Sequence, residues 1–238
     1  MKGLFVSTAL TVSLLASQAR ACEVALMLAV DVSGSINGDE YRIQMDGLAE
    51  ALRESGIAEA LILSEAQVAL MQWTGTGRQQ VTIPWTQITS EAEVLAFAAL
   101  VAEDQRVWRD FSTAIGEAME LAHTYFAAVD ECERLVLDIS GDGISNEGRF
   151  PTAVWPKLDE AGITVNALVI ENTGFALTPW FEANVIRGPA SFAVTANGFD
   201  EYPEQIVRKL YRELTVTVSG QPLDSAYALP MADGEPDL

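Results

Sequence analysis

The sequence of 238 residues predicts a doubly wound α/β domain, with a mostly parallel sheet, one antiparallel edge strand and helices on both faces. Short apolar segments alternate along the chain with amphipathic helical patterns, which is typical of a parallel sheet. Segments 67–74 and 80–85 flank the turn Gly75-Thr76-Gly77 and predict a hairpin, in which Pro84 favours an edge position. The length and the hydrophobic content of 49% allow one large core.

The first strand is expected to begin at Leu26 and to end at Asp31. Further strands are expected at 134–140, 163–170 and 190–195, and helices at 37–56, 90–103, 112–126, 151–162, from 178 onward, and 200–214. Asn37 and Glu40, and likewise Ser90 and Glu93, have the spacing of capping boxes, and Gly56 predicts the end of the first helix. Arg208, Lys209 and Arg212 suit the dipole at the end of the last helix.

The two ends of the chain differ from its centre. A basic start, an apolar run from Leu4 to Ala16 and the sequence Ala19-Arg20-Ala21 predict a secretory signal peptide, and the alternative is an uncleaved membrane anchor. The predicted division is a signal peptide at 1–21, one domain at 22–218 and a flexible acidic tail at 219–238. We expect an exported protein, periplasmic or secreted, with no stable membrane insertion after cleavage.

The charge balance restricts the partners. The chain carries 34 acidic and 14 basic residues, a formal net charge of −20. A surface this acidic is not suited to contact phosphate backbones, so we expect no nucleic-acid binding.

Oxygen-bearing side chains are predicted to meet at one edge of the sheet. Asp31, Ser33 and Ser35 alternate at the end of the first strand, where an extended backbone places alternate residues on one side. Asp142 follows the strand at 134–140, which neighbours the first strand in the common order, and Thr113 opens the helix that leads into it. Oxygen-only ligands suit a hard divalent cation such as Mg2+.

The same topology bears on the two cysteines. Cys22 and Cys132 each precede one of these two strands, which start at the sheet edge opposite the predicted metal site. Neighbouring strands lie about 5 Å apart, within disulfide reach. We therefore expect a Cys22–Cys132 disulfide, and two free thiols are the alternative.

The set of five oxygen-bearing residues resembles the metal-ion-dependent adhesion site (MIDAS) of the von Willebrand factor type A (VWA) domain, the fold of integrin I domains. Asp31-Val32-Ser33-Gly34-Ser35 matches that family's Asp-x-Ser-x-Ser motif, and segment 112–116 resembles its threonine segment, with Thr113 as the ligand. Segment 137–143 resembles the strand that ends in Thr-Asp-Gly, except that Gly141 stands where the family has threonine. The resemblance covers residues 23–217. Within the family, the chain is similar to an exported bacterial branch whose role is poorly defined.

This resemblance implies a Rossmann-like VWA fold and a metal-dependent protein-binding module that is not an enzyme. Ser33 and Ser35 would bind Mg2+ directly, Thr113 directly or through water, and Asp31 and Asp142 mostly through water, with Mn2+ or Ca2+ as alternative ions. A cation held by neutral ligands can accept a carboxylate, so the implied partner is a protein or peptide with an acidic residue.

Three other interpretations stay open. The five residues could be ordinary turn and capping residues. The chain could be a magnesium-dependent phosphohydrolase or phosphotransferase, since such enzymes also place an aspartate at the end of a parallel strand. It could also be a scaffold with a vestigial site. Asp138 is expected to be structural, and Trp108 and Phe111 either line the binding face or pack beneath the loop.

Overall fold

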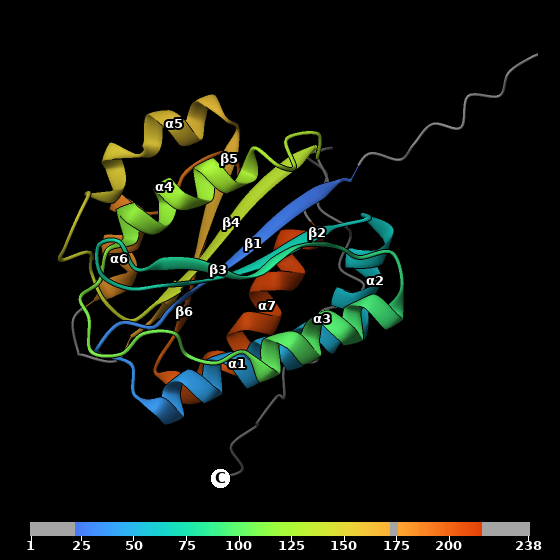
Figure 1. Ribbon diagram of the computed structural model, residues 1–238, viewed down its shortest axis with the longest axis horizontal. Helices are drawn as coiled ribbons and strands as arrows, with labels where there is room; N and C mark the ends of the chain where they lie inside the picture. The colour runs from blue at the N-terminus through green and yellow to red at the C-terminus, as the bar shows by residue number, and fades with distance from the viewer. Residues whose placement is uncertain (1–21, 172–175, 216–238) are drawn as a thin grey trace, which may run out of the picture.

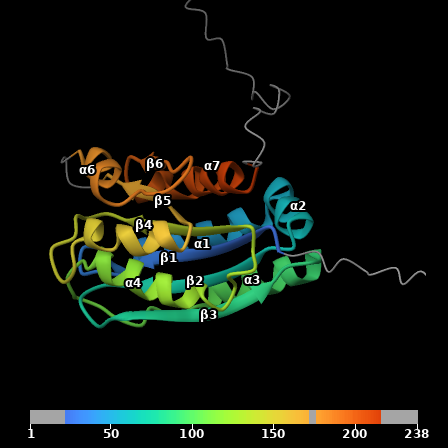
Figure 2. The same cartoon turned by 90° about the horizontal axis from the view of Figure 1, so that it is seen from above.

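The computed structural model describes residues 22–171 and 176–215. The predicted signal peptide and the predicted acidic tail lie outside these residues. Six strands form one sheet in the order β3-β2-β1-β4-β5-β6, as Figure 2 displays from above. The strands are β1 (Val24–Asp31), β2 (Gln67–Trp73), β3 (Gln79–Gln87), β4 (Arg134–Gly141), β5 (Ile163–Ile170) and β6 (Ala193–Ala196). Only β3 pairs antiparallel with its neighbour, at one edge. The predicted fold class is confirmed.

Helices cover both faces of this sheet (Figure 1). The α-helices are α1 (Gly38–Arg53), α2 (Ser55–Leu63), α3 (Glu91–Glu103), α4 (Ile115–Phe126), α5 (Trp155–Glu160), α6 (Leu177–Asn184) and α7 (Tyr202–Thr215). Short 3-10 turns, Pro151–Ala153 and Phe199–Glu201, precede α5 and α7. One core lies under α1, α2, α3 and α7, and the other lies under α4, α5 and α6.

Strand β1 supplies both cores because its side chains alternate. Leu26, Leu28 and Val30 enter the core under α1 and α7, whereas Met27 and Ala29 enter the core under α4. Every residue of β1 is buried, as expected of a central parallel strand. This position makes the carboxyl end of β1 a fixed point in the middle of the sheet.

Several local expectations need correction. The first helix ends at Arg53 rather than at Gly56, and a second helix, α2, follows with Gly56 inside it. The helix expected at 151–162 is a 3-10 turn followed by α5, and the strand expected at 190–195 is Ala193–Ala196. The capping box at Asn37 is present, with Asn37 accepting from Glu40 N–H and the Glu40 carboxylate accepting in return.

Lys209 does not act as a solvent-exposed cation at a helix end. Its side chain projects from α7 toward the sheet and is fully buried, with Nζ 2.5 Å from Asp138 Oδ1 and 2.6 Å from Glu213 Oε1. Asn166 on β5 donates to the same oxygen of Glu213 at 2.9 Å. Burial, and then the charge of Asp138, raises the pKa of Glu213. Asp138 therefore belongs to a buried ion-pair network that fastens α7 to the sheet.

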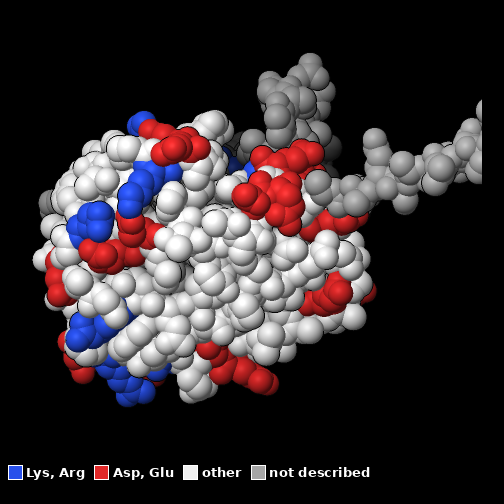
Figure 3. All heavy atoms as spheres, turned by 45° about the horizontal axis from the view of Figure 1, so that its top comes forward, with Lys and Arg blue, Asp and Glu red and all other residues white. Residues whose placement is uncertain are grey.

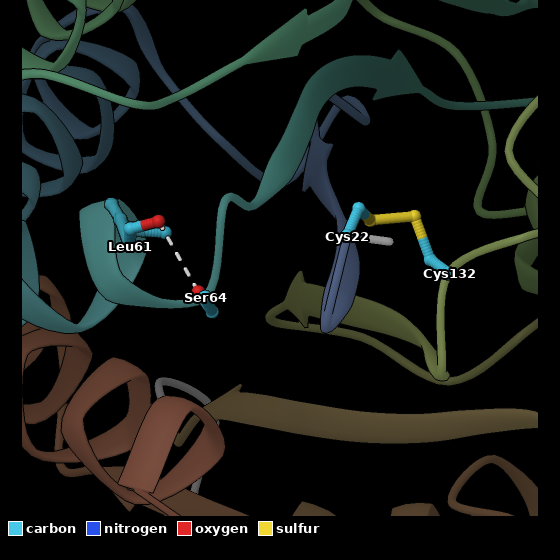
Figure 4. Close-up of a disulfide and its surroundings, with 4 residues drawn as sticks. All are labelled: Cys22, Leu61, Ser64 and Cys132. Carbon is cyan, nitrogen blue, oxygen red and sulfur yellow. Dashed lines mark hydrogen bonds between the residues drawn. A yellow bond between two sulfur atoms is a disulfide. The ribbon is translucent and has the colours of Figure 1, made fainter. Parts of the chain in front are cut away.

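A disulfide joins Cys22 and Cys132 where β1 and β4 begin, with the two Cα atoms 4.7 Å apart (Figure 4). Backbone bonds from Glu133 to Cys22 and from Arg134 to Glu23 continue the pairing of the two strands beside it. The bond spans 110 residues of sequence, so it closes a long loop. Within the described residues, no helix combines the length and the apolar character needed to cross a bilayer.

Candidate metal centre

The loop after β1 is a series of linked oxygen-bearing groups. Asp31 Oδ1 accepts the backbone N–H of Ser33 at 2.7 Å, and the hydroxyls of Ser33 and Ser35 lie 3.2 Å apart. Ser35 Oγ donates to Asp142 Oδ1 at 2.6 Å, across 107 residues of sequence. Because this bond uses the single hydroxyl hydrogen of Ser35, Ser33 is the donor in the pair of serines. Both hydroxyls keep lone pairs available for a cation.

The topology brings these groups together. Residues Val24–Val30 of β1 pair in register with Arg134–Ser140 of β4, so Asp31 and Asp142 follow two neighbouring strands at the same sheet edge. Gly141 has a clear role here, because a Cβ at this position would lie 3.1 Å from Asp31 Oδ2. The departure from the family's usual threonine leaves room for the carboxylate of Asp31.

Thr113 lies at the same edge, just before α4. A Cβ on Gly143 would lie 3.6 Å from Thr113 Oγ1, so this hydroxyl faces the segment that follows Asp142. Asn146 fixes the position, since it accepts the backbone N–H of Thr113 at 2.9 Å and donates its own backbone N–H to Thr113 O at 2.9 Å. Ser35, Thr113 and Asp142 together line an open cavity of about 720 Å3. All five predicted residues therefore gather at one edge of the sheet.

The two carboxylates are poorly compensated without a cation. Asp31 is 0% exposed and Asp142 is 3% exposed, and the Oδ2 atom of each has no hydrogen-bond partner among the described residues. Burial, and then the charge of Asp142, raises the pKa of Asp31 to about 8. Burial also raises the pKa of Asp142. Two orphaned carboxylate oxygens beside hydroxyls with free lone pairs fit a hard divalent cation.

Arg106 is a residue of this site that the sequence analysis did not single out. Its Nη2 donates to the carbonyl oxygens of Val32 and Ser33, each at 2.9 Å. Its positive charge opposes, in part, the rise in the pKa of Asp31 that burial and Asp142 cause. Phe111 accepts the backbone N–H of Gly34 at 2.7 Å. These bonds fasten the loop at 104–114 to the loop after β1. An arginine in an irregular segment carries no sequence signal for such a contact.

Other candidate residues divide between site and core. Phe111 is 38% exposed and lines the same cavity as Thr113, whereas Trp108 packs against the core under α1. Asp138 lies in the ion-pair network under α7 and is not part of the candidate metal centre. The described residues contain no cluster of three or more histidine, cysteine, aspartate or glutamate side chains that could hold a metal. The set at Asp31 is of another kind, with two carboxylates and three hydroxyls.

The fold is that of VWA-type domains. Proximal thread matrix protein 1 from the mussel byssus superposes with a TM-score of 0.62 at 20% identity, over 81% of this chain and 48% of that one. A second structure of the same protein, described as having a zinc-occupied MIDAS motif, gives a TM-score of 0.59 at 20% identity, over 81% and 47%. This chain spans about half the length of these structures.

Two bacterial structures share the fold. A von Willebrand factor type A protein from Catenulispora acidiphila has a TM-score of 0.54 at 15% identity, covering 81% of this chain and 42% of that one. An aerotolerance-related membrane protein from Bacteroides fragilis gives 0.51 at 15% identity, covering 79% and 99%. No curated protein matches the sequence. The chain belongs to the family described as "Protein of unknown function (DUF1194)", which matches residues 21–218.

Proposed function

We propose that this protein is an exported, non-enzymatic binding module that holds Mg2+ at Asp31, Ser33, Ser35, Thr113 and Asp142 and uses it to bind a carboxylate of a protein partner. The observation that carries the proposal is the pair of orphaned oxygens, Asp31 Oδ2 and Asp142 Oδ2. The Oδ1 atoms of the same two carboxylates are linked through the backbone N–H of Ser33 and the hydroxyls of Ser33 and Ser35. A bound cation would supply an electrophilic position for an anionic oxygen of the partner.

The chain's own residues determine what such a site can do. The hydroxyls of Ser33, Ser35 and Thr113 are neutral, so they leave most of a cation's charge for an external anion. Asp142 accepts the hydroxyl of Ser35 and Asp31 accepts the backbone N–H of Ser33, and both carboxylates would balance the charge of a cation. Asp31 and Ser33 are buried, whereas Ser35 is exposed, so the site is accessible from solvent at Ser35.

Exposed apolar side chains near the site support a protein partner. Phe111 and Ile144 line the cavity with 38% and 41% of their surface exposed, and Arg78 stacks on the ring of Phe111 at 3.8 Å. Large apolar side chains around a polar centre are typical of protein-binding surfaces. Export is supported by the predicted signal peptide at 1–21 and by the disulfide, which persists in oxidising compartments.

The decisive experiment is calorimetric titration with Mg2+, followed by titration with a short peptide that carries one glutamate. The intact chain should bind Mg2+ and should bind the peptide only when Mg2+ is present. Asp31→Ala should lose both, and the matched variant Asp130→Ala, at an exposed loop position, should keep both. Peptide binding that is the same in EDTA as in Mg2+ would end the proposal.

A magnesium-dependent phosphohydrolase or phosphotransferase is the second candidate, because Arg106 and Arg109 lie beside the metal centre. Against it, Ser33 occupies the position where such an enzyme would carry a second carboxylate. A phosphatase assay discriminates between the two functions. Metal-dependent turnover that Asp31→Ala abolishes would favour the enzyme over the binding module.

A further inference from the structure

A second cavity, of about 760 Å3, lies beside the metal centre and is lined by arginines. It is formed by the start of α1, the end of α3 and the loop that follows α3. Arg42, Arg106 and Arg109 contribute to its wall, together with the backbone of Gly34. In a chain with only 14 basic residues and a net charge of −20, three arginines around one cavity are a local concentration of positive charge.

Two of these guanidinium groups can attract an anionic ligand. Arg109 is exposed and has no hydrogen bond or ion pair within the described ranges. Arg106 donates from Nη2 to the carbonyl oxygens of Val32 and Ser33, and its Nε is buried, so its charge is what it offers a ligand in the cavity. Burial, and then the charge of Arg109, lowers the pKa of Arg106, so the two cations repel one another. An anion between them would relieve this repulsion.

The arginine cavity adjoins the metal centre. Gly34 and Asp110 line both cavities, so these two residues form the boundary between them. Gly34 is exposed and carries no side chain, and its N–H is bonded to Phe111 O. Figure 3 shows that the visible basic side chains lie mostly on the left, the side where the strands end, where they are intermixed with acidic side chains, and that the right side carries acidic clusters without basic ones. An extended ligand could therefore cross Gly34 and occupy both cavities.

We propose that Arg106 and Arg109 form an anion subsite that takes up a second carboxylate of the partner, so that the module selects segments carrying two acidic residues. This inference rests on the proposed function and specifies its partner. The charge of the cavity favours a carboxylate over a phosphate dianion. Glu103 and Asp110 also line it, and Arg42 is already paired with Asp46, so the charge available for a ligand is small.

The test uses the intact chain in saturating Mg2+ and two sets of glycine hexapeptides, acetylated at the N-terminus and amidated at the C-terminus, with one glutamate or with two. The glutamates of the second set are separated by zero to three glycines. We expect the best peptide with two glutamates to bind about tenfold more tightly, which corresponds to one charge-assisted hydrogen bond. Arg109→Gln should reduce this advantage to less than about threefold and leave Mg2+ affinity and single-glutamate affinity unchanged.

The matched control is Arg208→Gln, which removes the same charge from the outer surface of α7 and should keep the advantage. The NMR signal of Arg109 Nε–Hε should shift with the two-glutamate peptides only. The subsite is refuted if single-glutamate peptides bind with Mg2+ while two-glutamate peptides bind no more tightly. It is also refuted if Arg109→Gln and Arg208→Gln lose the advantage equally, or if inorganic phosphate shifts the Arg109 signal at lower concentrations than the two-glutamate peptide. If no peptide responds to Mg2+, the proposed function fails and the subsite fails with it.

Discussion

Replacing Asp31 by asparagine should stabilise the metal-free protein and should also remove its response to Mg2+. The Asp31 carboxylate is fully buried, its Oδ2 has no partner among the described residues, and the nearby charge of Asp142 raises its pKa further. Asparagine keeps the shape of this side chain, and its Oδ1 can still accept the N–H of Ser33. The variant therefore has no buried carboxyl to ionise or to keep protonated, and it keeps the local hydrogen bond.

The magnitude follows from the pKa of Asp31, which is raised from 3.8 to about 8. Because the folded-state pKa is the higher one, stability is greatest below about pH 4 and falls as the pH rises toward 8. Neutral pH lies about three units above the ordinary pKa, so keeping this carboxyl protonated at pH 7 costs about 4 kcal/mol at about 1.36 kcal/mol per unit. The amide group of asparagine, placed where Oδ2 has no partner, is a buried donor without an acceptor and lowers the free energy of unfolding by about 1–3 kcal/mol. The expected net gain in the free energy of unfolding is about 1–3 kcal/mol.

Urea unfolding at pH 7, in EDTA and in Mg2+, measures both effects. The natural protein should gain about 2.7 kcal/mol at a Mg2+ concentration 100 times the dissociation constant, and Asp31→Asn should gain nothing. Asp130→Asn, at an exposed loop position, serves as the control and should behave like the natural protein. A variant less stable than the natural protein in EDTA would refute the argument from the raised pKa of the buried Asp31 carboxyl. A variant that responds fully to Mg2+ would show that Asp31 does not hold the cation.

Three further changes test other parts of the structure. Lys209→Met leaves two buried carboxylates without their cation and should cost about 3–5 kcal/mol in urea unfolding; a loss below 1 kcal/mol would contradict the ion-pair network. Replacing both Cys22 and Cys132 by serine should lower the free energy of unfolding by about 2–5 kcal/mol, and an unchanged midpoint would mean that the closed loop adds no stability. Gly141→Ala places a Cβ 3.1 Å from Asp31 Oδ2 and should weaken Mg2+ binding in calorimetry, whereas unchanged affinity would mean that the carboxylate can shift.

The sequence was most informative where local pattern and topology agree. The apolar run that ends at Asp31 predicts a buried strand with its polar end at the sheet edge, and the structure has such a strand. The hairpin formed by β2 and β3 follows from its turn residues and from Pro84. Placing Thr113 and Asp142 beside Asp31 required only the order of the strands, because parallel neighbours end at the same edge.

What the sequence could not supply depends on contacts between distant segments. Gly56 resembles a helix stop, yet α2 continues past it because Ile57 and Leu61 are buried against the core. Lys209 resembles a surface cation, and only its contact with Asp138, 71 residues earlier, reveals a buried ion pair. The hydrogen bond from Arg106 to the carbonyl oxygen of Ser33 likewise joins residues 73 positions apart in the sequence. No periodicity or spacing encodes such pairs.

The disulfide has a mechanical consequence for the proposed binding of a partner. A partner bound at Ser33 and Ser35 would pull on the loop that leaves the end of β1, the strand at the centre of the sheet (Figure 1). The hydrogen bonds of β1 to β2 and β4 on either side would share a pull along the strand axis. At the far end, the bond between Cys22 and Cys132 ties β1 covalently to β4, so the two strands cannot slide past each other under load.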